Sequence, residues 1–273
     1  GLLFLFLPGT GAAPLQYAEL IEHAAQRGYH AVGLTYKSVP GVNYITVLRT
    51  DPELPELMRR ERLFGEALTD EIEVSRADSV VNRAEKLLAY LAAAHPGEGW
   101  DRYLLPGGGL AWNRVVASGQ SQGAGHAAFL SKRLVLAGAS MFAGPGDFVR
   151  DFGAAPWLTG PAQTPPGRLT AFTHVRDDTA AGFFSNQRLL GMEAFGPLQN
   201  IDGLPAEDVA STMLTSTLVI PGTNYHNCVA ADEFLPRDDA GSNLYAPVWD
   251  AMLDRHADVA PPAAEVQDPP EPG

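Results

Sequence analysis

One stretch decides the fold of this chain: Trp112-Asn-Arg-Val-Val-Ala-Ser-Gly-Gln-Ser-Gln-Gly-Ala-Gly125. The apolar run over residues 112–117 predicts a strand, the glycines after it predict a tight turn, and residues 127–132 continue as a helix. Within the turn, Gly119-Gln-Ser-Gln-Gly123 fits the pattern G-x-S-x-G, in which small residues let a strand reverse sharply into a helix. Ser121 would then project its hydroxyl above the sheet, where the helix N-terminus favours negative charge. The alternative is a tight glycine turn with a passive serine.

The same alternation of strands and helices runs through the rest of the chain. The continuous apolar run of residues 2–7, closed by Pro8-Gly9-Thr10-Gly11, is typical of a strand buried on both faces. Apolar side chains along one side of residues 79–94 predict an amphipathic helix. Further strands are expected at residues 29–36, 134–143, 169–175 and 215–220, and further helices at residues 14–27, 55–68 and 186–194. This pattern predicts an α/β fold with a mainly parallel sheet, helices on both faces, and ligands at the carboxyl ends of the strands.

Composition indicates one folded domain followed by a tail. The chain has 273 residues, of which 45% are hydrophobic and 19% charged, the balance of a packed globular protein. No linker-like change of composition interrupts residues 1–259, which are therefore expected to form one domain. The proline-rich residues 260–273 are expected to be disordered. A long loop over residues 144–167, rich in proline, glycine and aromatic residues, is expected to have a functional role.

Charge and cysteine content narrow the classes of partner and cofactor. A formal net charge of -13 argues against nucleic acid and anionic membrane surfaces, because both bind clustered basic residues. The apolar run of residues 2–7 is too short to insert into a membrane, so a soluble protein is expected. Gly1 in place of a methionine fits a processed or trimmed N-terminus and leaves a secreted or periplasmic location open. The single cysteine, Cys228, excludes a disulfide framework and a Cys-rich zinc site, and neither a metal nor an organic cofactor is expected.

A nucleophilic serine needs a general base, and the chain offers seven histidines. His226 lies in Pro221-Gly-Thr-Asn-Tyr-His-Asn227, directly after the last predicted strand, where a loop can bring an imidazole over the serine. His126 is expected to pack inside the fold, and His256, among charged neighbours, to be solvated. For His226, the alternative is a loop histidine whose hydrogen bonds go to the backbone.

The acid that orients the base is expected between the serine and the histidine in the chain. Residues 169–175 predict a strand that runs into Arg176-Asp-Asp-Thr179, which places two carboxylates at a strand end. Asp178 is the preferred candidate, because an aspartate followed by threonine and small residues makes the better turn into a helix. The preference is slight, and the other aspartate would cap the following helix or pair with Arg176.

Two backbone N–H groups are needed to stabilise the negative charge of a tetrahedral intermediate. The N–H of Gln122, directly after the serine, is the first candidate, and the N–H of Thr10 in the early glycine loop is the second. A nucleotide-binding interpretation of that loop would require a third glycine where Pro14 stands. It would also require an acidic residue at the end of the next strand, which is absent.

The chain resembles the α/β-hydrolase superfamily, in particular its serine esterase and lipase-like members. Four features carry the resemblance: the turn Gly119-Gln-Ser-Gln-Gly123, called the elbow below, the glycine loop of residues 8–11, the pair Asp177 and Asp178, and the loop of His226. The resemblance covers residues 2–257. It implies an α/β-hydrolase fold reduced at its N-terminal side, because the chain begins at what would be the family's third strand. It implies hydrolysis of carboxylic esters through an acyl-enzyme on Ser121, with Asp178 and His226 completing the triad.

The substrate is expected to be a small-molecule or polymeric ester. Trp157, Phe183 and Tyr225 are expected to line an apolar pocket, with core packing as the alternative for each. A serine peptidase, an amidase or an acyltransferase would use the same triad, and a non-catalytic binding protein on this scaffold is a further alternative. The sequence does not determine the oligomeric state.

Overall fold

The computed structural model describes residues 1–257, and the tail expected at residues 260–273 lies outside them. Its centre is a seven-stranded sheet in the order β2-β1-β3-β4-β7-β9-β8, in which every neighbouring pair is parallel. The α/β fold with a parallel sheet is thereby confirmed. The strands are β1 (Leu3–Leu7), β2 (His30–Gly33), β3 (Val115–Gln120), β4 (Gly138–Phe142), β7 (Leu169–His174), β8 (Gln199–Asn200) and β9 (Met213–Ser216).

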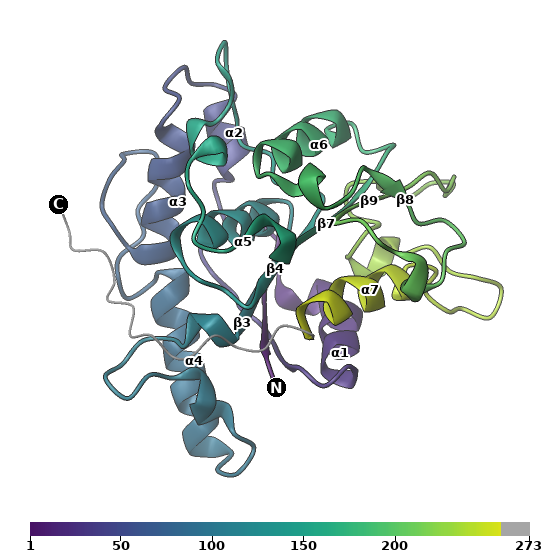
Figure 1. The fold of residues 1–273 in the computed structure, drawn as a ribbon. Helices are drawn as coiled ribbons and strands as arrows, with labels where there is room; N and C mark the ends of the chain where they lie inside the picture. Colours follow the sequence, from purple (N-terminus) through teal and green to yellow (C-terminus); the bar gives the residue numbers. More distant parts are fainter. Residues whose placement is uncertain (258–273) are drawn as a thin grey trace.

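Helices cover both faces of the sheet, as Figure 1 shows. On one face lie α4 (Val80–Ala94) and α5 (Gln122–Arg133), and on the other α1 (Ala18–Gln26) and α7 (Ala246–Ala257). Side chains of a strand point alternately to the two faces, so the leucines of β1 pack with α4 and α5, while its phenylalanines pack with α1 and α7. This division explains why the strand is apolar throughout.

One helix begins at the predicted residue, and two others begin several residues earlier than predicted. α4 begins as predicted, because the side chain of Ser79 accepts the backbone N–H of Asn82 as an N-cap. α5 begins at Gln122, five residues before the predicted start, because the glycines that allow the turn also belong to the first helical turns. α6 (Ala180–Leu189) likewise begins six residues before the helix expected at residues 186–194.

A helical segment between β2 and α4 stands over the carboxyl edge of the sheet. It contains α2 (Val42–Thr46) and α3 (Leu54–Phe64), which share a small apolar cluster of their own around Met58. α2 packs against the short hairpin of β5 (Phe148–Val149) and β6 (Gly153–Ala154). The α2–α3 segment therefore forms one side of the space above the strand ends.

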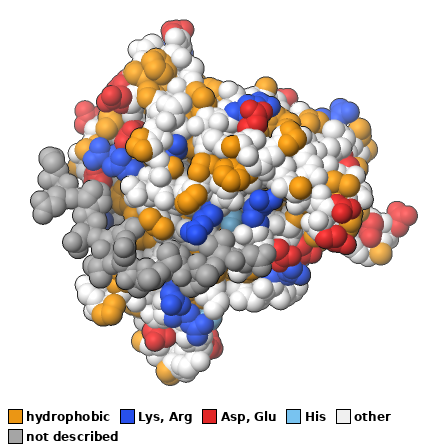
Figure 2. Space-filling model, viewed as in Figure 1, with side chains coloured by type: hydrophobic (Ala, Val, Ile, Leu, Met, Phe, Trp, Pro, Cys, Tyr) orange, Lys and Arg blue, Asp and Glu red, His pale blue; other side chains and the backbone are white. Residues whose placement is uncertain are grey.

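Two surface properties bear on possible partners. Within residues 1–257, no helix combines the length and the apolar character needed to cross a bilayer. On the face drawn in Figure 2, lysine and arginine side chains lie apart from one another and do not form one continuous patch.

Candidate active site

Ser121 occupies a strained turn between β3 and α5. Its backbone angles are φ 55° and ψ -112°, a conformation that a residue with a side chain adopts only when its surroundings impose it. The N–H of Ser121 donates to the carbonyl of Phe142 on β4 at 2.8 Å, and its own carbonyl accepts the N–H of Gly125 at 3.1 Å. These hydrogen bonds hold the strained turn at the carboxyl edge of the sheet, where the sequence places it.

The two glycines of the elbow are required by close packing. A Cβ on Gly119 would lie 2.4 Å from the carbonyl carbon of Gly123, and a Cβ on Gly123 would lie 1.8 Å from the carbonyl oxygen of Leu7. Both distances are far below a van der Waals contact. The absence of side chains at these positions lets α5 approach β1 and lets the chain reverse at Ser121.

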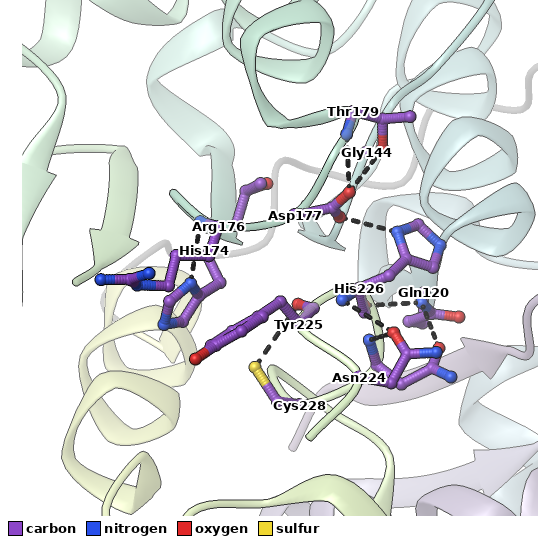
Figure 3. Close-up of polar contacts among 12 residues, drawn as sticks. Gln120, Gly144, His174, Arg176, Asp177, Thr179, Asn224, Tyr225, His226 and Cys228 are labelled. Atoms are coloured by element: carbon purple, nitrogen blue, oxygen red, sulfur yellow. Dashed lines mark hydrogen bonds and ion pairs between the residues drawn. The ribbon is translucent and has the colours of Figure 1, made fainter. Parts of the chain in front are cut away.

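Asp177 and His226 form a hydrogen-bonded pair above the sheet (Figure 3). Asp177 follows β7, and its Oδ2 lies 2.7 Å from Nδ1 of His226. Its Oδ1 accepts the backbone N–H and the hydroxyl of Thr179 at 2.9 and 2.6 Å. Burial raises the pKa of Asp177, but the hydrogen bonds from His226 and Thr179 outweigh it and leave the pKa below its ordinary value. A charged Asp177 that accepts the Nδ1 proton leaves Nε2 of His226 as a proton acceptor.

The hydrogen-bond partner of His226 is Asp177 and not Asp178, which corrects the sequence-based preference. The turn after β7 closes with a hydrogen bond from the N–H of Asp177 to the carbonyl of His174 at 3.1 Å. Asp177 is 6% exposed, whereas Asp178 is exposed and only lines the cavity wall. Asp177 also accepts the hydrogen bonds of Thr179, the residue directly before α6, but no side chain among the described residues caps that helix.

The loop that carries His226 is held at several points. The N–H of His226 donates to Oδ1 of Asn224 at 3.0 Å, and its carbonyl accepts from Nε2 of Gln120 at 3.1 Å. The ring of Phe183 lies 5.9 Å from the imidazole, centroid to centroid. The imidazole remains 32% exposed and faces the cavity that Ser121 also lines.

That cavity has a volume of about 680 Å³ and lies over the ends of β1, β3 and β7. Its wall combines polar groups with apolar ones, which is the usual composition of a small-molecule site. α2 contributes Val42 and Tyr44. Of the residues selected from the sequence, the cavity is lined by Thr10, Ser121, Gln122, Asp178, Phe183, Tyr225 and His226.

Trp157, expected in the substrate pocket, lies elsewhere. It is 7% exposed, its ring packs edge-on against Phe129 of α5 at 5.2 Å, and its Nε1 donates to Asp147 at 2.8 Å. It borders a separate cavity of about 420 Å³ beside α5. The expectation was wrong because the loop after β4 turns down along α5 and does not pass over the serine.

Gln122 is fixed by its side chain. Its Oε1 accepts the N–H of Val42 at 2.9 Å and Nη1 of Arg62 at 3.0 Å, and its Nε2 donates to the carbonyl of Ser38 at 2.7 Å. The backbone N–H of Gln122 lies in the first turn of α5, where N–H groups have no acceptor within the helix. Thr10 lies across the cavity after β1, so both candidate oxyanion donors border the same space as Ser121.

Two buried arginines on α3 were missed in the sequence. Arg59 is 1% exposed, forms an ion pair with the fully buried Asp147, and donates to the carbonyl of Gln122 at 3.3 Å and to Nδ1 of His126 at 3.0 Å. Arg62 is equally buried, and burial lowers its pKa to about 10. Their spacing of three residues puts them on one side of the predicted helix, which was the signal available.

His256 corrects a third expectation. It is fully buried, with Nε2 2.9 Å from the hydroxyl of Ser140, and burial lowers its pKa to about 3. The ring fits because residue 138 is glycine: a Cβ there would lie 2.1 Å from Nδ1 of His256. His126 is fully buried, as predicted.

Neither a metal-binding cluster nor a similar protein indicates what this site does. Within residues 1–257, no group of three or more His, Cys, Asp or Glu side chains is arranged to hold a metal ion. Comparisons of the chain with protein-family models, with curated proteins and with solved structures yield no match.

Proposed function

We propose that the protein is a serine hydrolase that cleaves carboxylic esters. The observation that carries this proposal is the hydrogen bond between Asp177 and His226, beside a strained Ser121 that lines the same cavity as the imidazole. A serine hydroxyl is a weak nucleophile at its ordinary pKa, and an adjacent imidazole oriented by a carboxylate is the common means of activating it.

The reaction would proceed in two acyl-transfer steps. The hydroxyl oxygen of Ser121 attacks the ester carbonyl while Nε2 of His226 takes its proton. The imidazolium, stabilised by Asp177, then donates that proton to the leaving alcohol, and the acyl group stays on Ser121. Water next attacks the acyl-enzyme and loses a proton to Nε2 of His226. The bond between the acyl carbon and the Ser121 oxygen then breaks, the imidazolium returns the proton to that oxygen, and the carboxylic acid leaves.

Two backbone N–H groups would stabilise the negative oxygen in both steps. They belong to Gln122, at the start of α5, and to Thr10, in the loop after β1. The side-chain contacts of Gln122 keep this part of the backbone in place before substrate binds, so no reorganisation is required as charge develops.

The strand order supports an α/β-hydrolase fold as part of the proposal. β3 carries the serine in the interior of the sheet, and β7 and β9, on one side of it, precede the aspartate and the histidine. Nucleophile, acid and base therefore follow one another both along the chain and across the sheet, as in the superfamily that the sequence resembles. An amidase or an acyltransferase would use the same groups, and no contact among the described residues favours either.

The test is a serine replacement with a matched control. In Ser121→Ala, turnover of p-nitrophenyl esters should fall by at least about 1,000-fold, because the nucleophile is lost while the fold stays intact. A fluorophosphonate probe should label Ser121 in the unmodified protein. Ser185→Ala, on the exposed side of α6, is the control and should keep full activity.

Circular dichroism of each variant establishes that it is folded. Ester turnover retained in a folded Ser121→Ala variant would contradict the assignment. A panel of esters and amides with the same acyl group then separates an esterase from an amidase, and added alcohol reveals acyl transfer through a second product.

A further inference from the structure

Gln120 occupies the position directly before Ser121, and the proposed mechanism gives it no task. It is the last residue of β3 and is 1% exposed. Its Nε2 donates to the carbonyl of His226 at 3.1 Å and to Oδ1 of Asn227 at 3.2 Å, and its Oε1 accepts the hydroxyl of Tyr17 at 3.0 Å. Figure 3 shows the hydrogen bonds between this amide and the loop that carries His226. Both ends of the buried amide are therefore hydrogen-bonded.

The contacts of Gln120 reach the oxyanion side of the site as well. The hydroxyl of Tyr17 lies 3.4 Å from the N–H of Gly9, one residue before Thr10. A Cβ on Gly9 would lie 2.5 Å from Oε1 of Gln120, so this loop residue must be glycine for the amide to fit against it. Burial raises the pKa of Tyr17, which keeps its hydroxyl protonated and able to donate.

We propose that Gln120 is a positioning residue that fixes the loop of the proposed general base His226 (residues 221–227) relative to the nucleophile Ser121. The role rests on the proposed function. Asp177 holds the imidazole of His226 at Nδ1, and Gln120 holds the backbone of the same residue at its carbonyl. Gln120 and Ser121 are joined by a peptide bond. The hydrogen bond from Gln120 to the carbonyl of His226 therefore links the backbone of His226 to the backbone of Ser121. A displacement of about 1 Å between reacting groups can cost about 100-fold in rate.

The distinguishing variant is Gln120→Met, which keeps the length of the side chain and removes its hydrogen bonds. We expect kcat for a p-nitrophenyl ester to fall about 10- to 100-fold while KM changes less than about threefold, because the base is misplaced and the cavity wall is intact. Gln120→Glu keeps the acceptor for Tyr17 but places an oxygen opposite the His226 carbonyl. It should show the same loss if Gln120→Met does not fold.

The matched control is Gln187→Met. Gln187 is also fully buried, and it donates to the carbonyl of Gly144 at 2.9 Å and to the hydroxyl of Thr173 at 3.4 Å, neither of which belongs to the loop of His226. A merely structural role predicts that both methionine variants lose stability and keep kcat once they are folded. A positioning role predicts that only the Gln120 variants lose kcat.

A spectroscopic readout is independent of turnover. The Nδ1 proton shared by His226 and Asp177 should give a downfield proton resonance that disappears in His226→Gln. This resonance should shift or broaden in Gln120→Met and not in Gln187→Met. An unchanged resonance together with kcat within about twofold of the unmodified enzyme would overturn the role of Gln120.

Failure of the proposed function has a different signature. In that case the unmodified protein neither turns over esters nor reacts with the fluorophosphonate probe, although the resonance still responds to Gln120→Met. Active unmodified protein with unaffected Gln120 variants overturns the positioning role alone.

Discussion

The two sides of the cavity are built by different means. One side consists of strand ends, with Ser121 after β3, Asp177 after β7 and His226 after β9. The other consists of α2 and α3, which reach the cavity with Tyr44 and Arg59. Hydrogen bonds among polar side chains, and between side chains and backbone, hold the strand-end side. The buried ion pair between Arg59 and Asp147 ties α3 to the loop after β4 on the helical side.

This difference separates the groups that we propose to react from the groups that shape the cavity. Parallel strands bring their carboxyl ends to one edge, so the topology itself brings the proposed reacting groups together. The helical side also carries large apolar side chains in contact with solvent: Val39, Tyr44, Val47 and Leu48 are 58%, 68%, 46% and 56% exposed. Replacements on the strand-end side should therefore lower activity, and replacements on the helical side should lower stability or change substrate preference.

The largest expected effect is a loss of kcat on replacement of Asp177, with its neighbour Asp178 as the control. Asp177→Asn should lower kcat by about 100- to 10,000-fold, because an amide neither stabilises the imidazolium nor selects the required tautomer of His226. Asp178→Asn should stay within about threefold, since Asp178 makes no hydrogen bond to His226 and is exposed. Steady-state kinetics of the two variants decide the point. Equal losses would assign the acid role to both carboxylates.

On the helical side, the buried ion pair is expected to govern stability. Arg59→Met leaves Asp147 charged and buried without its partner, which should lower the free energy of unfolding by about 3–5 kcal/mol. Its neighbour is the control: Arg60 pairs with Glu66 at a partly exposed position, and Arg60→Met should cost less than about 1 kcal/mol. Urea unfolding measures both, and similar values for the two variants would contradict the comparison.

Low pH should lower the free energy of unfolding through His126, which lies on α5 and contacts Arg59 of α3. Burial, together with the charges of Arg59 and Arg62, holds the pKa of His126 well below its ordinary value, so the folded protein keeps it neutral. The unfolded chain binds a proton at this histidine below about pH 6.5, so stability is fully present above that pH and is lost as the pH falls. The loss is at most about 1.4 kcal/mol per pH unit.

His126→Asn tests this pH dependence. The asparagine retains an acceptor for Arg59 but does not titrate, so its unfolding free energy should fall less steeply from pH 7 to pH 5. His256 has a lowered pKa for the same reason and should supply part of the remaining slope. An unaltered slope in His126→Asn would show that His126 contributes nothing to acid sensitivity.

The smallest effect is expected for the exposed apolar side chains. Tyr44 lines the cavity and Leu48 follows it by four residues, so we expect an alkyl chain that extends out of the cavity past α2 to contact both. Replacing both by serine should raise KM for an octanoyl ester about 10-fold and leave KM for an acetyl ester unchanged. Tyr90→Ser, on an equally exposed part of α4, is the matched control. Parallel changes for the two esters would show that this rim does not bind the acyl chain.

Local signals were sufficient for several features of the site. The strand before Ser121 and the loop of His226 follow from neighbouring residues, because glycine tolerance and side-chain periodicity act over a few positions. The same applies to the parallel sheet, since apolar runs alternating with helical patterns have few other arrangements.

Only the folded chain decided which groups meet. Asp177 and His226 are 49 positions apart, and Gln120 and His226 are 106 positions apart, so no local pattern could select Asp177 over Asp178 or reveal the task of Gln120. Burial of Arg59 and His256 depends in the same way on which helix packs over which strand. The sequence by itself determined the elbow and the class of fold, because these depend on backbone freedom and periodicity along the chain. The tertiary structure decided the pairing and burial of the polar groups, because these depend on contacts between segments distant in sequence.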